Sequence, residues 1–306
     1  MLPPIHGSES RSRRSRSRLV FRARSVGAAA RCFLLLLFFL SGCRRSAPAA
    51  GGDRVPARRV VSLAPNLTEI LFAIGAGPSL VGVSDYSDFP PQAASLPHVG
   101  GLDPSAEAVA ALRPDLVLAT ADGGNRKGAV SALEAAGIPV LLVPGGSLDD
   151  VLAGIRQIGA RTGHSEEAER LVRSLAARRE AVRRETAGRK RPWAVLLVWP
   201  DPPQAAGGKT FLNDVLTEAG AENLLADRPG WPVVSPEFLA TASIDVLVVP
   251  DSPGNRPVFD RAVLSGALSR GAAAKARIVR VDESSLTRPG PRVFSALEDL
   301  ARKLAP

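Results

Sequence analysis

One supersecondary unit occurs twice in this chain, and its two copies lie 130 residues apart. The first copy runs from Ser105-Ala106-Glu107 to Asp115-Leu116-Val117, and the second from Ser235-Pro236-Glu237 to Asp245-Val246-Leu247. Ser, Glu and Asp stand at the same offsets in both copies, with no gap between them. The separation is far longer than the repeat of a solenoid or a propeller. It predicts two similar lobes, and a cleft between lobes is a common place to hold a small molecule.

Strand and helix patterns alternate on both sides of a central helical region. Short runs rich in β-branched residues at 59–63, 80–83, 116–119 and 140–143 precede that region, and runs at 193–199, 245–249 and 277–281 follow it. Such alternation indicates α/β lobes with mainly parallel sheets. Apolar residues at helical spacing predict one long backbone helix from Ser165 towards Ala187, about 34 Å in length. We expect this helix to join the two lobes, with the ligand cleft between them.

Capping signals predict where several helices begin. Asn66 followed by Glu69 has the spacing of a capping box. Asp103 and Pro104 would be the N-cap and first residue of the helix in the first repeat. Ser235 would cap the helix of the second repeat, and Ser165 the long helix.

The first 43 residues have the organisation of a signal peptide. An Arg-rich start is followed by the apolar run 32–40, which is too short to span a bilayer of about 30 Å, and then by Leu40-Ser41-Gly42-Cys43. This tetrapeptide resembles a bacterial lipobox, so we expect Cys43 to be lipidated. The alternative is a plain signal peptide with a chance cysteine. The predicted organisation is a lipoprotein signal peptide at 1–43, a flexible tether at 44–57, an N-terminal lobe at 58–147, a helical linker at 148–190 and a C-terminal lobe at 191–306.

The charge of the chain belongs mostly to this leader. The formal net charge is +9, but residues 1–43 hold eight Arg and one Glu, so the remainder is nearly neutral. A basic surface for nucleic acid is therefore not expected. Cys43 would be the one cysteine of the mature chain, which excludes an intramolecular disulfide and a thiolate metal site.

The sequence lacks a recognisable catalytic constellation. Gly207-Gly208-Lys209-Thr210 ends like a phosphate loop, but Pro203 stands where that motif needs glycine. There is no Gly-x-Ser-x-Gly and no His-Glu-x-x-His, and the predicted mature chain keeps only two isolated histidines. We expect neither an enzyme nor a resident metal or cofactor. A lipoprotein enzyme and an interaction-only scaffold remain as alternatives.

Aromatic residues in loops suggest a binding surface instead. Tyr86 lies in a loop after a strand, Trp199 ends a strand, and Trp231 stands between Gly and Pro just before a helix. Open α/β sheets place ligands at the ends of strands, and rigid aromatic faces give contact area at low entropic cost. Trp193 is interpreted as an ordinary core residue. Arg288 is either a capping arginine or a donor to a polar ligand.

Several segments resemble one transport family. Residues 59–69, 81–91, 112–117 and 123–125, with Trp231-Pro232 and Pro291-Arg292, are similar to periplasmic vitamin B12-binding proteins of ABC importers. The resemblance covers most of residues 58–304. It implies two α/β lobes on a backbone helix, little closure on ligand binding, and delivery of the ligand to a membrane permease. Haem- and siderophore-binding relatives share the opening motif.

The resemblance also implies roles for individual residues. Tyr86 matches a corrin-contacting tyrosine, and Trp199 and Trp231 match aromatic positions of the second lobe. Glu107 and Glu237 match the glutamates that dock on permease arginines, one from each lobe. A ligand-contacting loop is matched by Ser284, Ser285, Leu286, Thr287 and Arg288.

The chain departs from that family at several positions. The tryptophans expected near Gly101-Leu102 and near Thr120 are missing, and Ser285 and Leu286 replace aromatic residues. Ala219 stands at one position of a family disulfide. The pocket is therefore expected to be less aromatic than in the family.

These observations lead to one expectation about function. The chain is expected to be a monomeric, lipid-anchored, extracytoplasmic solute-binding protein that carries vitamin B12 or a related corrinoid. Its partners would be the corrinoid, the permease dimer with its ATPase subunits, and the membrane. Haem or a ferric siderophore is the alternative ligand.

Overall fold

The computed structural model describes residues 55–121, 126–265 and 268–305. The predicted signal peptide, the lipidation site Cys43, most of the tether and the motif at 123–125 lie outside the described residues.

The first sheet is wholly parallel and has the strand order β2-β1-β3-β4. Its strands are β1 (Val60–Ser62), β2 (Leu80–Val83), β3 (Leu116–Thr120) and β4 (Val140–Val143). Between them lie α1 (Pro65–Ala73), α2 (Ala106–Ala111) and α3 (Arg126–Ala135), together with the 3-10 turns η1 (Gly77–Ser79) and η2 (Pro91–Ser95). The apolar runs read from the sequence form these strands because helices cover both faces of the sheet and bury it.

The second sheet has the order β6-β5-β8-β9, with β7 paired to the start of β5. Its strands are β5 (Trp193–Pro200), β6 (Pro203–Ala205), β7 (Glu222–Asn223), β8 (Val246–Asp251) and β9 (Arg277–Asp282). Its helices are α6 (Phe211–Glu218), α7 (Pro236–Thr241), α8 (Arg256–Ser265), α9 (Glu283–Leu286) and α10 (Val293–Leu304). Among the strands of this sheet that the structure describes, only β6 runs antiparallel, so the prediction of α/β lobes with mainly parallel sheets is confirmed.

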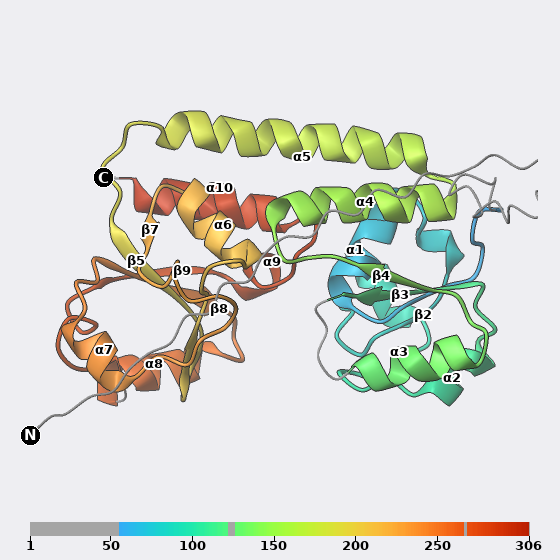
Figure 1. Ribbon diagram of the computed structural model, residues 1–306, viewed down its shortest axis with the longest axis horizontal. Helices are drawn as coiled ribbons and strands as arrows, with labels where there is room; N and C mark the ends of the chain where they lie inside the picture. The colour runs from blue at the N-terminus through green and yellow to red at the C-terminus, as the bar shows by residue number, and fades with distance from the viewer. Residues whose placement is uncertain (1–54, 122–125, 266–267, 306) are drawn as a thin grey trace, which may run out of the picture. The chain divides into compact units, whose positions relative to one another are not determined.

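Two helices connect the sheets. They are α4 (Leu148–Thr162) and α5 (Ser165–Thr186), and Gly163 turns the chain between them with a φ of 77°. Figure 1 shows α5 running along both α4 and α10, so that it reaches over both lobes. At 22 residues it is about 33 Å long.

A nearly buried ion pair fixes α5 to the helices beneath it. The Arg179 guanidinium donates to the Glu218 carboxylate of α6, at 2.8 Å from Nε and 2.6 Å from Nη2, and also contacts Asp149 of α4. Burial raises the pKa of Glu218, but hydrogen bonds from Arg179 and Arg183 outweigh it and leave that pKa lowered. The pair therefore stays charged near neutral pH and links α4, α5 and α6.

The hydrophobic core does not stop at the lobe boundary. One continuous cluster includes Leu67 of α1, Ile155 of α4, Val172 of α5, Leu212 of α6 and Leu297 of α10. Each fully buried side chain of this kind contributes about 1.5–3 kcal/mol. Two further clusters lie within single lobes. The two lobes therefore share a core beneath α5.

The repeated unit has the same local structure in both lobes. The Oγ atoms of Ser105 and Ser235 cap α2 and α7 by accepting the backbone N–H of the third residue of each helix, both at 3.1 Å. The Asp115 N–H donates to the Arg59 carbonyl at 2.9 Å, and the Asp115 carboxylate accepts the Arg59 N–H at 3.1 Å. Asp245 makes the same reciprocal contacts with Trp193. Each Asp thus ties the start of one strand to its neighbour.

Three predicted helix starts are wrong. The N-cap of α1 is Ala64, because Pro65 begins the helix and Asn66 and Glu69 are used for contacts with the other lobe. The first repeat helix is capped by Ser105 and not by Asp103, which precedes a proline and is therefore biased towards extended backbone. Ser165 is the first helical residue of α5, because only His164 separates that helix from Gly163.

The predicted burial of Trp193 is also wrong. Trp193 is the first residue of β5, and its side chain is half-exposed.

Candidate ligand-binding cleft

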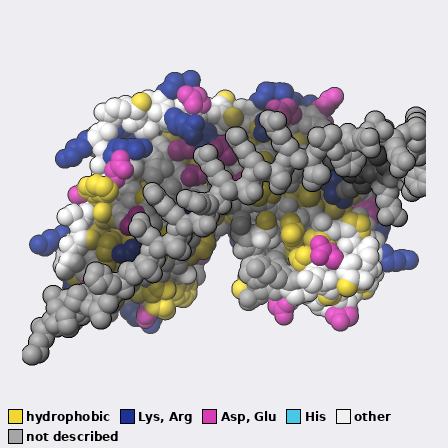
Figure 2. All heavy atoms as spheres, in the orientation of Figure 1, with side chains coloured by type: hydrophobic (Ala, Val, Ile, Leu, Met, Phe, Trp, Pro, Cys, Tyr) yellow, Lys and Arg dark blue, Asp and Glu magenta, His cyan; other side chains and the backbone are white. Residues whose placement is uncertain are grey.

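A cleft of about 450 Å³ lies between the two lobes. Figure 2 shows the surface hollowed there, on the side away from α5, with hydrophobic side chains on both flanks. The first lobe supplies the start of α1, Thr120 at the end of β3, and the 145–146 turn after β4. The second lobe supplies residues 209–211, 230–231 and 287–289. The cleft therefore lies at the carboxyl ends of parallel strands, where α/β sheets bind ligands.

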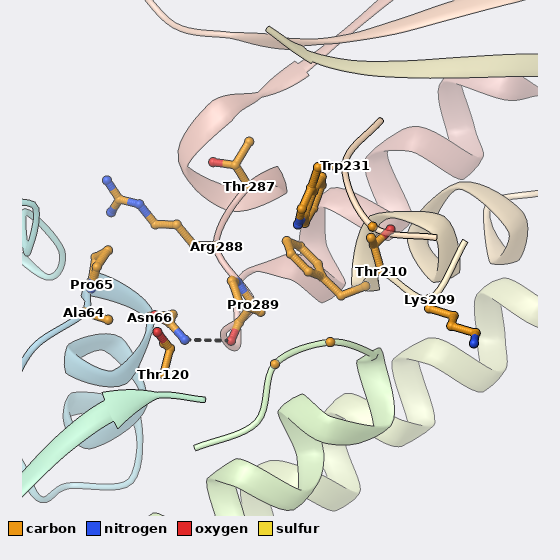
Figure 3. Close-up of a pocket in the computed structure, with 14 residues that line it drawn as sticks. Ala64, Pro65, Asn66, Thr120, Lys209, Thr210, Trp231, Thr287, Arg288 and Pro289 are labelled. Atoms are coloured by element: carbon orange, nitrogen blue, oxygen red, sulfur yellow. Dashed lines mark hydrogen bonds between the residues drawn. The ribbon is translucent and has the colours of Figure 1, made fainter. Parts of the chain in front are cut away.

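Trp231 forms the aromatic wall of the cleft. Its ring meets Phe211 edge to face, with centroids 6.2 Å apart and an interplanar angle of 66°. Trp231 lies near the centre of the lining in Figure 3, and Phe211 also lines the cleft. The Trp231 side chain keeps 43% of its surface exposed, so one face is open to a ligand.

A glycine-rich strap holds Trp231 in place. The Gly207 N–H donates to the Gly230 carbonyl, and the Gly230 N–H donates to the Gly208 carbonyl, both at 2.9 Å. A Cβ on Gly207 would lie 1.9 Å from the carbonyl oxygen of Arg228, so only glycine allows this approach. The sequence Gly207-Gly208-Lys209-Thr210, which ends like a phosphate loop, is therefore explained by backbone packing.

Residues from both lobes meet at the floor of the cleft. The Asn66 side-chain amide donates to the Pro289 carbonyl at 3.2 Å, drawn as a dashed line in Figure 3. Below it, the Glu69 carboxylate accepts two bonds from Arg292, at 2.9 and 2.6 Å. Only 2% of the Glu69 side chain is exposed. A bidentate pair of this kind fixes both distance and orientation between the lobes.

A second ion pair completes this inter-lobe ion network, which consists of Glu69, Asp88, Arg288 and Arg292. The two terminal nitrogens of Arg288 contact the two carboxylate oxygens of Asp88, and Nη1 also lies 3.5 Å from Glu69. Hydrogen bonds from Arg288 lower the pKa of the Asp88 carboxyl, although burial acts in the opposite direction. The Arg292 guanidinium also lies over the Phe89 ring, 4.2 Å from its centroid.

The three predicted aromatic residues have different positions. Trp231 lines the cleft, whereas Tyr86 and Trp199 do not belong to its lining. Tyr86 packs over Gly101 and remains 49% exposed. Trp199 is 46% exposed, and its Nε1–H donates to the Asp201 carbonyl at 2.8 Å. Gln204, the partner of Trp199 on β6, donates a hydrogen bond to the Trp231 carbonyl. Trp199 therefore lies near the aromatic wall of the cleft.

The predicted ligand loop folds as the short helix α9 and the turn after it. Thr287 and Arg288 line the cleft. Ser284 and Ser285 lie beside the Asp282 cap of α9, and the Ser284 hydroxyl also accepts a bond from Arg292. Leu286 is fully buried in the shared core. The expectation that Leu286 contacts ligand is contradicted, because a leucine on this helix packs inward and leaves no surface exposed.

The two predicted docking glutamates are exposed on equivalent helices. Glu107 lies in the first turn of α2 and Glu237 in the first turn of α7. In Figure 1 both helices lie on the side of their lobes away from α5. The Glu107 carboxylate accepts its own backbone N–H and the Ser105 hydroxyl, which lower its pKa. Next to Glu237, Arg228 lies 5.2 Å from the centroid of the Phe238 ring.

Sequence reasoning missed most of the inter-lobe ion network beside the cleft. Asp88, Glu69 and Arg292 were not assigned to the site, although Glu69 is the one charge between Arg59 and Asp85. A lone carboxylate in an apolar helix requires a distant counter-ion, and that signal was available. Lys209, which lines the far end of the cleft, was also missed.

None of the helices described is both long enough and apolar enough to cross a membrane. Within the same residues, no group of three or more His, Cys, Asp or Glu side chains is placed to hold a metal ion.

Residues 60–285 match the periplasmic binding protein family. The chain is 32% identical over 255 residues to an uncharacterized ABC transporter substrate-binding lipoprotein, YvrC, of Bacillus subtilis, covering 81% of this chain and 80% of that protein. It is 31% identical over 253 residues to the vitamin B12-binding protein of Salmonella paratyphi A, covering 81% and 91%.

Solved structures agree with these relatives. The periplasmic heme-binding protein RhuT of Roseiflexus has a TM-score of 0.72 at 30% identity, covering 81% of this chain and 98% of that one. The vitamin B12-binding protein BtuF of Vibrio cholerae has a TM-score of 0.70 at 25% identity, covering 81% and 97%. The chain therefore belongs to the periplasmic binding protein family and serves as the substrate-binding component of an ABC importer.

Proposed function

We propose that this protein captures vitamin B12 or a related corrinoid in the inter-lobe cleft and delivers it to the permease. The observation that carries the proposal is the open cleft with the half-exposed ring of Trp231 on its wall. A flat macrocycle buries apolar area well against such a ring. The vitamin B12-binding relatives support this choice of ligand.

The proposed contact residues extend beyond the lining of the cleft. Thr287, Arg288 and Trp231 line the cleft, while Tyr86 and Trp199 are exposed outside it. A corrinoid is larger than a typical drug-sized ligand, so part of it would project from the 450 Å³ cleft. We assign Tyr86 and Trp199 to that projecting part. Ser284 and Ser285 are assigned to the edge of the same loop.

Haem is the second candidate ligand. It is favoured by the RhuT-like fold and by Tyr86, the one tyrosine of the chain, whose phenol oxygen is a known type of haem-iron ligand. A ferric siderophore is the third member of this class. In each case the ligand is cargo, and we propose that the protein performs no chemistry on it.

Titration of the purified full-length chain with cyanocobalamin, haemin and a ferric siderophore tests the ligand. Calorimetry and visible absorption should give micromolar or tighter binding of cyanocobalamin. Trp231→Ala should weaken it by about tenfold or more, because one stacked aromatic is worth about 1–2 kcal/mol. Trp193→Ala is the matched control. Trp193 is about as exposed as Trp231, but it is the first residue of β5 and does not line the cleft. Tight binding of haemin without cyanocobalamin would reject the corrinoid.

We further propose that Glu107 and Glu237 dock on arginines of the permease, one from each lobe. Both are exposed, and both lie on helices at the side of the lobes onto which the cleft opens. Glu107→Arg and Glu237→Arg together should abolish corrinoid uptake while leaving ligand affinity unchanged. Glu180→Arg on α5 is the control, because that helix lies on the opposite side. Uptake that survives both reversals would refute the docking role.

We also propose that lipid on Cys43 anchors a monomeric mature chain to the membrane, with lobes at 58–147 and 191–306 around a helical linker. The support is the sequence at Leu40-Ser41-Gly42-Cys43 and the lipoprotein among the relatives. Cys43→Ser should release the protein from the membrane fraction and stop incorporation of labelled fatty acid. Continued labelling of that variant would show that Cys43 is not the acceptor.

A further inference from the structure

The arginine at the cleft floor already pairs with two carboxylates. Arg288 contacts Asp88 through both terminal nitrogens, and its Nη1 also lies 3.5 Å from Glu69. Figure 3 shows its guanidinium directed towards the first lobe, away from Trp231. The arginine therefore presents its aliphatic stem and backbone to the cleft, and its charge to Asp88.

The charges at this end of the cleft balance. The inter-lobe ion network contains two arginines, Arg288 and Arg292, and two carboxylates, Glu69 and Asp88. Hydrogen bonding to Arg288 lowers the pKa of Asp88, so its carboxylate remains ionised at neutral pH. A ligand carboxylate that approached Arg288 would have to displace Asp88, which is 65% exposed and would repel it.

The other cation of the lining does not offset this repulsion. Lys209 is exposed at the opposite end of the cleft. In Figure 3 Lys209 lies beyond Thr210 and Trp231 as seen from Arg288, and its side chain points away from them. Solvent between charges placed so far apart screens their effect on one another.

Resting on the corrinoid-binding function proposed above, we propose that Asp88 determines charge specificity. By neutralising Arg288, it makes the cleft floor accept macrocycles whose peripheral groups are uncharged amides and reject those whose groups there are carboxylates. Asp88 is thus a specificity residue that acts through Arg288. The cargo class that fits this floor is a neutral, amide-bearing ring.

A matched pair of ligands isolates the effect of charge. Cyanocobalamin and its monocarboxylic acids differ by one amide replaced with a carboxylate, on the same ring. Calorimetric titration of the full-length chain should show that the wild type binds the amide about tenfold more tightly than at least one of the acids, a difference of about 1.4 kcal/mol. Asp88→Asn should bring this ratio close to one by freeing the charge of Arg288.

Three variants assign the effect to Asp88 and Arg288. Asp85→Asn removes an exposed carboxylate from the same loop, 3.5 Å from His98, and should keep the wild-type ratio. Asp88→Glu keeps the charge and should keep the preference for the amide. In the double variant Asp88→Asn with Arg288→Gln, the affinity gained for the acid should disappear, because no free guanidinium remains.

The outcomes separate this inference from the choice of cargo. An unchanged ratio in Asp88→Asn, or an equal change in Asp85→Asn, would overturn the role of Asp88 even if corrinoids bind tightly. If the wild type binds no corrinoid, haemin and its dimethyl ester form a second matched pair, and a preference for the ester that Asp88→Asn removes would support the inference with another cargo. Binding of neither pair would refute both proposals.

Discussion

The two lobes share one structural unit but use it in different surroundings. In both, a serine caps the helix, an exposed glutamate follows in its first turn, and an aspartate ties two strand starts together. The residues that face the cleft are not repeated: the first lobe presents small and polar groups, and the second presents Trp231, Phe211 and Arg288.

This difference separates the roles of the two kinds of residue. Repeated positions build the sheets and present the same face twice, which suits a partner with two similar halves. Unrepeated positions form an asymmetric cleft, which suits a ligand without such symmetry. The glycine strap at Gly207 and Gly208 exists in the second lobe alone among the described residues, and it holds the aromatic wall.

The largest expected effect comes from breaking that strap. Gly207→Ala places a Cβ 1.9 Å from a backbone oxygen and should destabilise the protein by about 3 kcal/mol, measured by denaturant unfolding. In the first lobe, Gly128→Ala on α3 meets no atom within 4 Å and should stabilise the helix by about 0.5–1 kcal/mol. A loss below about 1 kcal/mol for Gly207→Ala would mean that the strap is not a rigid support.

Replacing the aspartate of either repeat should lower the free energy of unfolding by less than this, and by different amounts in the two lobes. The Asp115 carboxylate accepts two backbone N–H groups, from Arg58 and Arg59, whereas Asp245 accepts one, from Trp193. Asp115→Ala should therefore cost about 2 kcal/mol and Asp245→Ala about 1 kcal/mol. Thermal unfolding of the two variants checks the order. Equal losses would show that the second bond of Asp115 adds nothing.

The capping serines should be nearly equivalent. Ser105→Ala and Ser235→Ala each remove one bond to a helix N–H, so each should cost about 1 kcal/mol. Thr at either position should restore most of the loss. If one substitution left the free energy of unfolding unchanged and the other lowered it by about 1 kcal/mol, the two caps would have the same geometry but unequal contributions to stability.

The smallest effect concerns acid stability and contrasts Asp88 with Glu107. The pKa of Asp88 is lowered in the folded protein, so its contribution is present above the ordinary aspartate value of about 3.9 and is lost as the pH falls through the lower folded value. Asp88→Asn should lower the unfolding temperature near neutral pH and converge with the wild type below about pH 3. Glu107→Gln should change the unfolding temperature less than Asp88→Asn does, because solvent screens the interactions of this exposed carboxylate. If the unfolding temperature of Asp88→Asn lay below that of the wild type by the same amount at every pH, the ion pair could not be the cause of the difference.

Local patterns predicted much of this fold because they depend on neighbours in sequence. Alternating strands and helices, the long α5 and the Ser235 cap all follow from residues within a few positions of each other. Trp193 was misassigned because a strand pattern does not show whether the first residue of a strand is covered by the core. The two-residue β7 and three-residue β6 carry too few residues for a periodic signal.

The site was harder to predict because its key contacts are remote in sequence. Asn66 and Glu69 have the spacing of a local cap, but their partners Pro289 and Arg292 are each 223 residues away. Leu286 matched a ligand loop by position, whereas α9 turns it into the core. Trp231 could be selected because its Gly and Pro neighbours mark a loop beside a helix.

The pairing of Glu69 with Arg292 has a consequence for how the chain is made. Synthesis begins at the amino end, so α1 emerges long before the segment that neutralises its buried carboxylate and covers its apolar face. Non-local contacts of this range form late, because loop closure must come first. The N-terminal lobe can be completed only when Arg292 and α10 have been made, so a copy truncated before them leaves a defect in the part that was made first.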